Sequence, residues 1–424
     1  MSYVASRLSA VKPSASMAAS MAAKALRATG VDVIDLGLGE PDFPTPAHVA
    51  EAAHKAALAG ETLYTAAAGT PALRAAVAEK FRRENGLDYG PDDIVVANGA
   101  KQIIFNALMA TLNDGDEVIT PAPYFVSYPE MAKLLGGVPV MPVCGVDAGF
   151  RLTPAVLEAA ITPRTKWLFL NMPGNPSGAV YSLAELQALG AVLARHPQVL
   201  ILSDEIYEHI LFDGRKFVSF GKACPELKDR TLIVNGVAKA YAMTGWRVGY
   251  AAGPAPLLKA MNTVQSQSVT SVAAPMQAAA LAALTGPQDC IPTFRKAFER
   301  RRDLVVNMLN AAKGVTCPKP EGAFYVYPSV KGVLGRTIRG KVAGSSAELA
   351  TIILDARRGT FGKVEHTTSA AKATWVLAMG AEVTPVVTPG ERLVAISAAT
   401  ERPPGSLPCI CPMTTSWTGA STAP

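Results

Sequence analysis

The sequence is poor in several features that would point to particular classes of protein. Only 17% of its 424 residues are charged, the net charge is +6, and lysine and arginine form no long tract. No stretch approaches the roughly 18 consecutive apolar residues that a membrane-spanning helix needs. We therefore expect neither nucleic acid nor a membrane as a partner.

Cysteine is also scarce, and its spacing excludes two further classes. The chain has six cysteines, and only Cys409 and Cys411 lie close together. This distribution suggests neither a disulfide framework nor a zinc site, so we expect no metal and a reducing, cytoplasmic environment. The first thirty residues are rich in alanine and serine but lack the apolar run of a signal peptide. Residues 16–29 predict a helix instead.

Apolar residues, at 49%, are abundant enough to form a large core, and the length indicates two domains. Apolar runs that predict strands alternate with segments that predict helices, which favours an α/β fold. We predict a three-layer αβα arrangement around a mostly parallel central sheet, plus a smaller α/β domain. The predicted strands are residues 94–97, 117–120, 167–170, 199–202 and 231–234, and the predicted helices are 48–58, 71–85, 103–112, 183–193 and 290–312.

The predicted domain division has three parts. Residues 1–45 contribute to the small domain, residues 46–290 form the large domain, and residues 291–424 form the small C-terminal domain. The last part, residues 355–424, is atypical because it is rich in proline, threonine and serine towards its end and lacks the period of a closing helix.

Lys239 is the strongest candidate for a functional residue. It follows a fully apolar predicted strand, residues 231–234, after a glycine and other small residues. Ligands of open α/β sheets bind beyond the carboxyl ends of strands. An amine shielded from water there is less readily charged and more nucleophilic, which predicts a Schiff-base lysine. The alternative is an ordinary surface lysine at the start of a helix.

Three other residues have similar positions, each with a simpler alternative. Asp204 emerges at the end of the predicted strand 199–202, although an acid there could merely cap a helix. Asn175 lies in a loop stiffened by proline and glycine, although it could belong to an ordinary turn. Arg247 follows Lys239 by eight residues, and its guanidinium suits a phosphate, although a surface ion pair would also explain it.

Five motifs, taken in order, make the pattern specific. They are Gly39-Glu-Pro-Asp-Phe43, Asn98-Gly-Ala-Lys-Gln102, Asn175-Pro-Ser-Gly178, Asp204-Glu-Ile-Tyr207 and Lys239-Ala-Tyr-Ala-Met-Thr-Gly-Trp-Arg247. From about residue 5 to about residue 354 the chain resembles the fold-type I pyridoxal-phosphate aminotransferases. More narrowly, it resembles the bacterial class Ib aspartate (aspartate/prephenate) aminotransferases.

The resemblance implies a role for each matching residue around pyridoxal 5'-phosphate. Lys239 would be the Schiff-base lysine and proton carrier, and Asp204 would lie against the pyridine nitrogen. Tyr207 and Asn175 would bind the phenolic oxygen. The remaining positions are Gly99, Ala100, Lys101 and Arg247 at the phosphate, Phe125 stacked on the ring, and Gly39, Phe125 and Asn175 at the substrate. Tyr64 would reach the phosphate of a neighbouring subunit, which implies a homodimer with shared active sites.

The resemblance also implies a reaction. It would be a ping-pong transfer of an amino group from L-aspartate to 2-oxoglutarate, giving oxaloacetate and L-glutamate. Prephenate, an aromatic amino acid or a broad range of amino acids are alternative substrates. A third alternative is a cofactor-binding pseudoenzyme, because the resemblance stops after Asp355.

Relatives carry, in a later segment, an arginine that clamps the substrate α-carboxylate. The corresponding position here is Ala395, and Arg392 lies three residues away. A frameshift and a divergent C-terminus both explain this pattern.

Overall fold

The computed structural model describes residues 3–11, 21, 24–25, 27–30, 34–35, 39–338, 340–355, 375–376 and 396–397. A seven-stranded sheet forms the centre, in the order β2-β8-β7-β6-β5-β3-β4, and β8 runs antiparallel to both of its neighbours. The other strands are parallel to one another, as predicted. The strands are β2 (Ile94–Ala97), β8 (Gly249–Ala252), β7 (Thr231–Gly236), β6 (Leu200–Asp204), β5 (Thr165–Asn171), β3 (Glu117–Ile119) and β4 (Val138–Val140).

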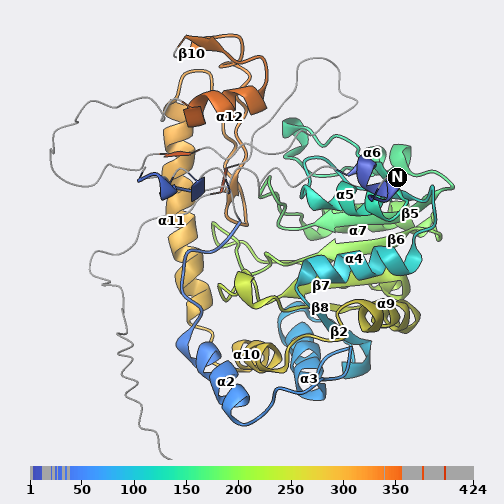
Figure 1. The fold of residues 1–424 in the computed structure, drawn as a ribbon. Helices are drawn as coiled ribbons and strands as arrows, with labels where there is room; N and C mark the ends of the chain where they lie inside the picture. Colours follow the sequence, from blue (N-terminus) through green and yellow to red (C-terminus); the bar gives the residue numbers. More distant parts are fainter. Residues whose placement is uncertain are drawn as a thin grey trace, which may run out of the picture.

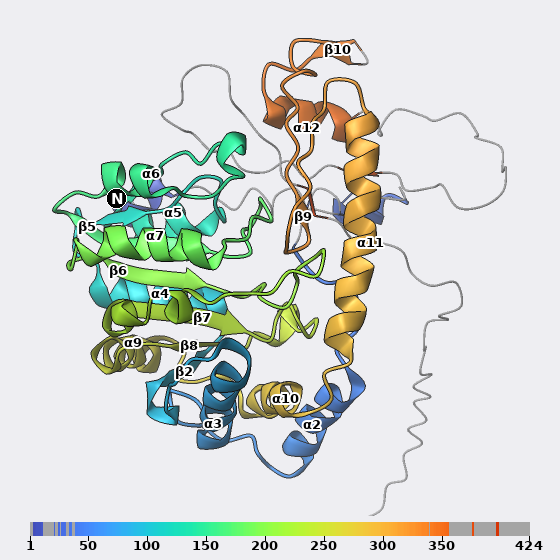
Figure 2. The same cartoon turned by 180° about the vertical axis from the view of Figure 1, so that it is seen from behind.

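Helices cover both faces of this sheet (Figures 1 and 2). Alternate residues of β2 show the two sides, because Val95 packs in a cluster with α4 and α9, whereas Val96 packs in a cluster with α3 and α10. The predicted three-layer αβα arrangement is therefore confirmed. The helices of this part are α2 (Ala47–Leu58), α3 (Pro71–Lys80), α4 (Ala100–Thr111), α5 (Ser127–Leu134), α6 (Pro154–Ala160), α7 (Leu183–Ala194), α8 (Phe220–Ala223), α9 (Ala255–Ser268) and α10 (Ala274–Thr285).

The predicted helix over residues 71–85 differs from the observed one in its last turn. The α-helical part ends at Lys80, and a π-helix, η2 (Phe81–Asn85), completes the segment. The predicted helix over residues 183–193 is observed as α7, and Ser182 caps it in a reciprocal capping box with Glu185.

A long helix, α11 (Cys290–Ala311), runs from beside α2 and α10 to α12 (Ser346–Asp355) (Figure 1). Short strands accompany this part: β9 (Tyr325–Val326), β10 (Thr337–Ile338) and β11 (Lys341–Val342). Two further pairs join distant segments: β1 (Ile34–Asp35) with β12 (Trp375–Val376), and β13 (Ile396–Ser397) with β9. The proposed domain boundaries stay a prediction.

Some predictions fall on residues that the structure does not describe. They are most of the helix over 16–29, the positions Arg392 and Ala395, and most of the atypical segment 355–424. Among the described residues, no helix combines the length and the apolar character needed to cross a membrane.

Candidate active site

Four functional motifs meet at one edge of the sheet because of its topology. The parallel strands β2, β6 and β7 all end at this edge. Asn98 directly follows β2, Asp204 is the last residue of β6, and Lys239 lies three residues after the end of β7. Strand β8 runs the opposite way, so it begins at this edge with Arg247 just before it. A single edge therefore collects two cations, a carboxylate and a helix start.

The amine of Lys239 is enclosed, although the residue as a whole is only partly buried. Its Nζ donates to the carbonyl oxygen of Gly39 at 2.6 Å and lies 5.7 Å from the ring centre of Tyr207 and 5.6 Å from that of Phe324. Burial lowers the pKa of Lys239 to about 8, against the opposing effect of the Glu40 carboxylate. Such an amine is a stronger nucleophile near neutral pH than a solvated lysine.

Asp204 lies buried at the end of β6. Its Oδ2 accepts a hydrogen bond from the hydroxyl of Tyr128 at 2.5 Å, and its Oδ1 accepts one from the backbone N–H of Ile206 at 3.3 Å. Burial raises the pKa of Asp204 to about 6, while the bond from Tyr128 acts in the opposite direction. The carboxyl is therefore an anion at neutral pH, available to a cationic or protonated group.

Tyr128 is a residue that the sequence reasoning missed. It lies three residues after Phe125, at the start of α5, and the two rings meet edge to face at a centroid distance of 5.4 Å. The aromatic spacing over one helical turn was a signal for this pair. Its bond to Asp204, 76 residues away, could be recognised only in the fold.

The hydroxyl of Tyr207 lies in a small polar group near Lys239. It is 2.6 Å from the hydroxyl of Tyr325, and the Nδ2 of Asn175 donates to both oxygens, at 3.4 and 3.2 Å. A side chain at Gly39 would run into the Tyr325 hydroxyl, so glycine is required there by close approach. No role for Tyr325 was predicted from the sequence.

The turn from β2 into α4 forms a cradle for an anion. Gly99 has φ +87°, and a methyl group there would lie 2.6 Å from the Nη2 of Arg247. A side chain at Gly249 would run into the backbone nitrogen of Ala100, the first residue of α4. The first N–H groups of a helix have no intrahelical partner, so the start of α4 can donate hydrogen bonds to an anion.

Lys101 completes the positive charge of the cradle. Its Nζ lies 5.2 Å from the ring centre of Phe125, and burial together with the nearby Arg247 lowers its pKa. The Arg247 side chain is held by the carbonyl oxygen of Thr244 at 2.8 Å. The arrangement suits a phosphate, which takes both charge and hydrogen bonds from such a site.

Tyr64 is the one predicted site residue that stands apart from this cluster in the described part of the chain. It is 91% exposed, and its neighbour Leu63 is 81% exposed. The other predicted residues, which are Gly39, Gly99, Ala100, Lys101, Phe125, Asn175, Asp204, Tyr207, Lys239 and Arg247, lie around the carboxyl edge of the sheet. Their individual roles stay predictions.

The fold and this edge define an α/β enzyme with an enclosed lysine amine, a buried carboxylate and an anion cradle. The chain belongs to the aminotransferase class I and II family, whose model matches residues 31–357. It is an aminotransferase, and enzymes of this family work on amino acids and 2-oxo acids with pyridoxal phosphate. The match ends close to the point where the sequence resemblance stops.

Individual relatives agree with this assignment. The chain is 58% identical over 340 residues to an aspartate/prephenate aminotransferase of Cereibacter sphaeroides, covering 80% of this chain and 85% of the relative. A crystal structure of the aspartate aminotransferase from Rhizobium meliloti has a TM-score of 0.84 and 47% identity, and covers 95% of both chains. The aspartate aminotransferase of Thermus thermophilus, solved with maleate, has a TM-score of 0.78 and 45% identity, covering 84% of this chain and 90% of that one.

Proposed function

We propose that this chain transfers an amino group between L-aspartate and 2-oxoglutarate by a ping-pong mechanism with pyridoxal 5'-phosphate. The observation that carries the proposal is the enclosed amine of Lys239, whose pKa is about 8, facing the Asp204 carboxylate and the cations Arg247 and Lys101. The names of the relatives, which are aspartate or aspartate/prephenate aminotransferases, support the choice of L-aspartate.

The residues present fit this cofactor. Its phosphate would lie in the cradle of Gly99, Ala100, Lys101 and Arg247, where an added methyl group at Gly99 would collide with the guanidinium. Its pyridine nitrogen would pair with Asp204, a buried carboxylate whose ionised form lacks a cationic hydrogen-bond partner among the described residues.

The phenolic oxygen and the ring also find suitable partners. Tyr207 and Asn175 offer a hydroxyl and an amide donor at one place near Lys239. Phe125 offers an aromatic face beside Lys101, and stacking on such a face is a common way to hold a flat ring.

When bound, the cofactor supplies a ring that accepts the electron pair released from the substrate Cα. The protein's own residues do the rest. At pH 7, roughly one tenth of an amine with a pKa of about 8 is neutral, so Lys239 Nζ can take a proton and return it. Asp204 is ionised above about pH 6 and would keep a ring nitrogen beside it protonated. Gly39, whose lack of a side chain allows its close approach to Tyr325, would lie against the substrate carboxylate.

We also propose a homodimer with shared active sites, in which Tyr64 reaches the phosphate of the neighbouring subunit. Its hydroxyl-bearing ring and the adjacent Leu63 are more than four-fifths exposed in the single chain. Exposed large apolar side chains side by side are unusual unless a partner covers them. A cytoplasmic location fits the scarcity of cysteine and is part of the same proposal.

The central test is spectroscopic. Purified protein loaded with pyridoxal phosphate should show the visible absorption band of a lysine-bound cofactor, and Lys239→Ala should lose it. An identical spectrum in that variant would refute the assignment of Lys239.

The half-reaction with L-aspartate then tests the substrate. Loss of the visible band on adding L-aspartate supports the proposal. A faster loss with the amino product of prephenate, or with aromatic amino acids, favours a second candidate function, a prephenate or aromatic aminotransferase. That candidate is supported by the aspartate/prephenate names of several relatives. If the cofactor binds but neither L-aspartate, L-glutamate nor an aromatic amino acid converts it, the result favours a cofactor-binding pseudoenzyme.

A further inference from the structure

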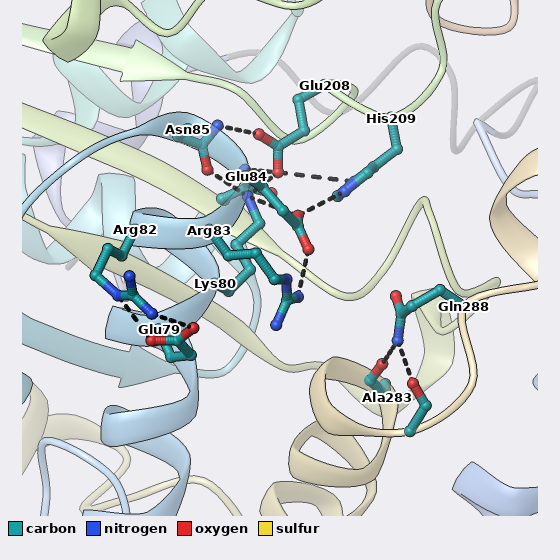
Figure 3. Close-up of polar contacts among 12 residues, drawn as sticks. Glu79, Lys80, Arg82, Arg83, Glu84, Asn85, Glu208, His209, Ala283 and Gln288 are labelled. Atoms are coloured by element: carbon teal, nitrogen blue, oxygen red, sulfur yellow. Dashed lines mark hydrogen bonds and ion pairs between the residues drawn. The ribbon is translucent and has the colours of Figure 1, made fainter.

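A buried polar cluster includes Lys80, Asn85 and Glu208 (Figure 3). Its centre is the carboxylate of Glu208, the residue that follows Tyr207. The other members are Lys80 at the end of α3, Asn85 in the π-helix η2, and Asn235 in β7, four residues before Lys239. Lys80, Asn85, Glu208 and Asn235 are all buried.

The carboxylate of Glu208 connects its own loop to two other segments of the chain, α3 with the adjoining η2, and β7. The Oε1 of Glu208 pairs with the ammonium of Lys80 and accepts from the Nδ2 of Asn235 at 2.7 Å. Its Oε2 accepts from the Nδ2 of Asn85 at 2.5 Å. Glu208 is therefore held from α3 and η2 on one side and from β7 on the other.

The π-helix makes this arrangement possible. Lys80 donates to the Oδ1 of Asn85, five residues later, at 2.8 Å. Residues five apart come together in π geometry, whereas an α-helix brings together residues three or four apart. The irregular turn, which the sequence did not predict, thus supplies a second donor to the same carboxylate.

Glu208 is the negative member of a charged group. Burial alone would raise its pKa, but the charge of Lys80 keeps it below the ordinary value. Two further residues lie within ion-pair distance: the Oε2 of Glu84 is 3.6 Å from Lys80 Nζ, and the Nδ1 of His209 is 3.7 Å from Glu208 Oε1. The charge of Glu208 also acts on the buried Glu205, Tyr241 and Tyr250. Glu84, Glu208 and His209 are close enough to share a metal ion, but Lys80 already brings its own positive charge to Glu208.

A buried ion pair is a weak source of stability, because removing two charges from water costs about as much as their attraction returns. What it adds is a fixed geometry. Adjacent residues Tyr207 and Glu208 contact different groups: Tyr207 meets Tyr325, Asn175 and Lys239, whereas Glu208 meets Lys80, Asn85 and Asn235. The hydrogen bond from Asn235 therefore connects Glu208, and with it the loop that carries Tyr207, to β7, the strand that precedes Lys239.

We propose that Glu208, held by Lys80, Asn85 and Asn235, is a positioning residue that sets the Tyr207 hydroxyl relative to the Lys239 amine. This inference rests on the proposed function, in which Tyr207 donates to the cofactor's phenolic oxygen. Glu208 itself touches neither substrate nor cofactor, and it acts through Tyr207.

The test is a pH titration of the visible band in the cofactor-loaded protein, with Glu208→Gln, Tyr207→Phe and the double variant. Without this donor, the phenolic oxygen attracts the proton on the Lys239 nitrogen more strongly. The pH at the midpoint of the titration should therefore rise. One hydrogen bond to a charged oxygen corresponds to roughly tenfold, or about one pH unit. Glu208→Gln should shift the midpoint in the same direction as Tyr207→Phe, and the double variant should shift it no further.

A matched control separates positioning from stability. Glu117→Gln makes the same change in another buried carboxylate, which is bonded to Arg164 at 2.6 Å, at the amino end of β3 and thus at the opposite edge of the sheet. It should lower the melting temperature and leave the midpoint at its wild-type value. Asn235→Ala, which keeps the ion pair, should give a smaller shift in the same direction, and it replaces Glu208→Gln if that protein does not fold.

The outcomes are distinct. A wild-type protein that shows no visible band with pyridoxal phosphate overturns the proposed function. A normal band, lost in Lys239→Ala but with an unchanged midpoint in Glu208→Gln and Asn235→Ala, overturns only the role of Glu208. Shifts that add in the double variant also overturn it, because they would mean that Glu208 acts independently of Tyr207.

Discussion

The hydrogen bond from Tyr128 to Asp204 allows a prediction that does not depend on a bound cofactor. Tyr128→Phe removes the hydroxyl that donates to Asp204 Oδ2 at 2.5 Å and leaves the ring packed in the core. A hydrogen bond to an ionised acceptor contributes about 1 to 2 kcal/mol more than one to a neutral acceptor. Since 1.36 kcal/mol corresponds to one pH unit, the substitution should move the pKa of Asp204 from about 6 to roughly 7.

The sign of the pH dependence follows from the raised pKa. Folded Asp204, with a pKa of about 6, keeps a proton that the unfolded chain releases near its ordinary value of 3.8. Its contribution to the free energy of unfolding therefore falls as the pH rises from about 4 to 6 and is level above that range. In Tyr128→Phe, the fall continues to roughly pH 7, because the ionised carboxylate has lost its donor.

Tyr128→Phe should lower the free energy of unfolding by about 1 kcal/mol at pH 5, where Asp204 is protonated and the lost hydrogen bond is a neutral one. At pH 8, where Asp204 is ionised and the lost hydrogen bond is to a charged acceptor, the loss should be about 2 to 3 kcal/mol. Urea unfolding of the cofactor-free protein at both pH values, at one protein concentration, measures the difference. Tyr181→Phe is the control, because this buried hydroxyl accepts from the backbone N–H of Leu152 at 2.8 Å. Equal losses at pH 5 and pH 8 in Tyr128→Phe would refute the reasoning.

Three further substitutions test the cradle and the substrate anchor. Gly99→Ala should cost about 1 to 3 kcal/mol of stability, because Gly99 has φ +87° and ψ +161°, and its methyl group should weaken pyridoxal-phosphate binding by displacing Arg247. Gly115→Ala, at φ +89° with nothing nearby, should also lower stability but should leave cofactor binding unchanged. Arg247→Lys should weaken cofactor binding by roughly tenfold or more in an absorbance titration, since a lysine cannot form the paired bonds of a guanidinium; unchanged affinity would remove Arg247 from the phosphate site. Ala395→Arg should raise the rate of the L-aspartate half-reaction by roughly ten- to a hundredfold, and no change would show that another residue holds the α-carboxylate.

Much of the candidate site could be predicted because its residues follow strands that read clearly in the sequence. The strands β6 and β7 contain the apolar runs Leu200–Leu202 and Leu232–Val234, and Asp204 and Lys239 lie two and five residues after them. Parallel strands put their carboxyl ends at one edge, so Asp204 and Lys239 could be placed together without coordinates. The capping box of Ser182 and Glu185 is local in the same sense, and it could be read from four consecutive residues.

Other parts depend on contacts that no local pattern contains. The strand β8 was not predicted, because Gly249-Tyr-Ala-Ala252 lacks the β-branched residues typical of strands. Its glycine is nevertheless needed, since a side chain at Gly249 would collide with the start of α4. The π-helical turn of η2 was also missed, because its partner Glu208 lies 123 residues from Asn85.

The substrate anchor and the cofactor site differ in how they depend on the fold. The strand β13 pairs with β9, so that Ser397 lies opposite Tyr325, which borders the site through Tyr207. Backbone pairing of this kind requires no particular side chain, so the pairing of β13 with β9 does not by itself specify an arginine for the substrate carboxylate. The residues proposed to hold the cofactor all come before residue 325, in segments that match the family's motifs. Cofactor capture and substrate turnover can therefore be lost independently in this chain, and the L-aspartate half-reaction, measured with and without Ala395→Arg at full cofactor occupancy, reports on the second alone.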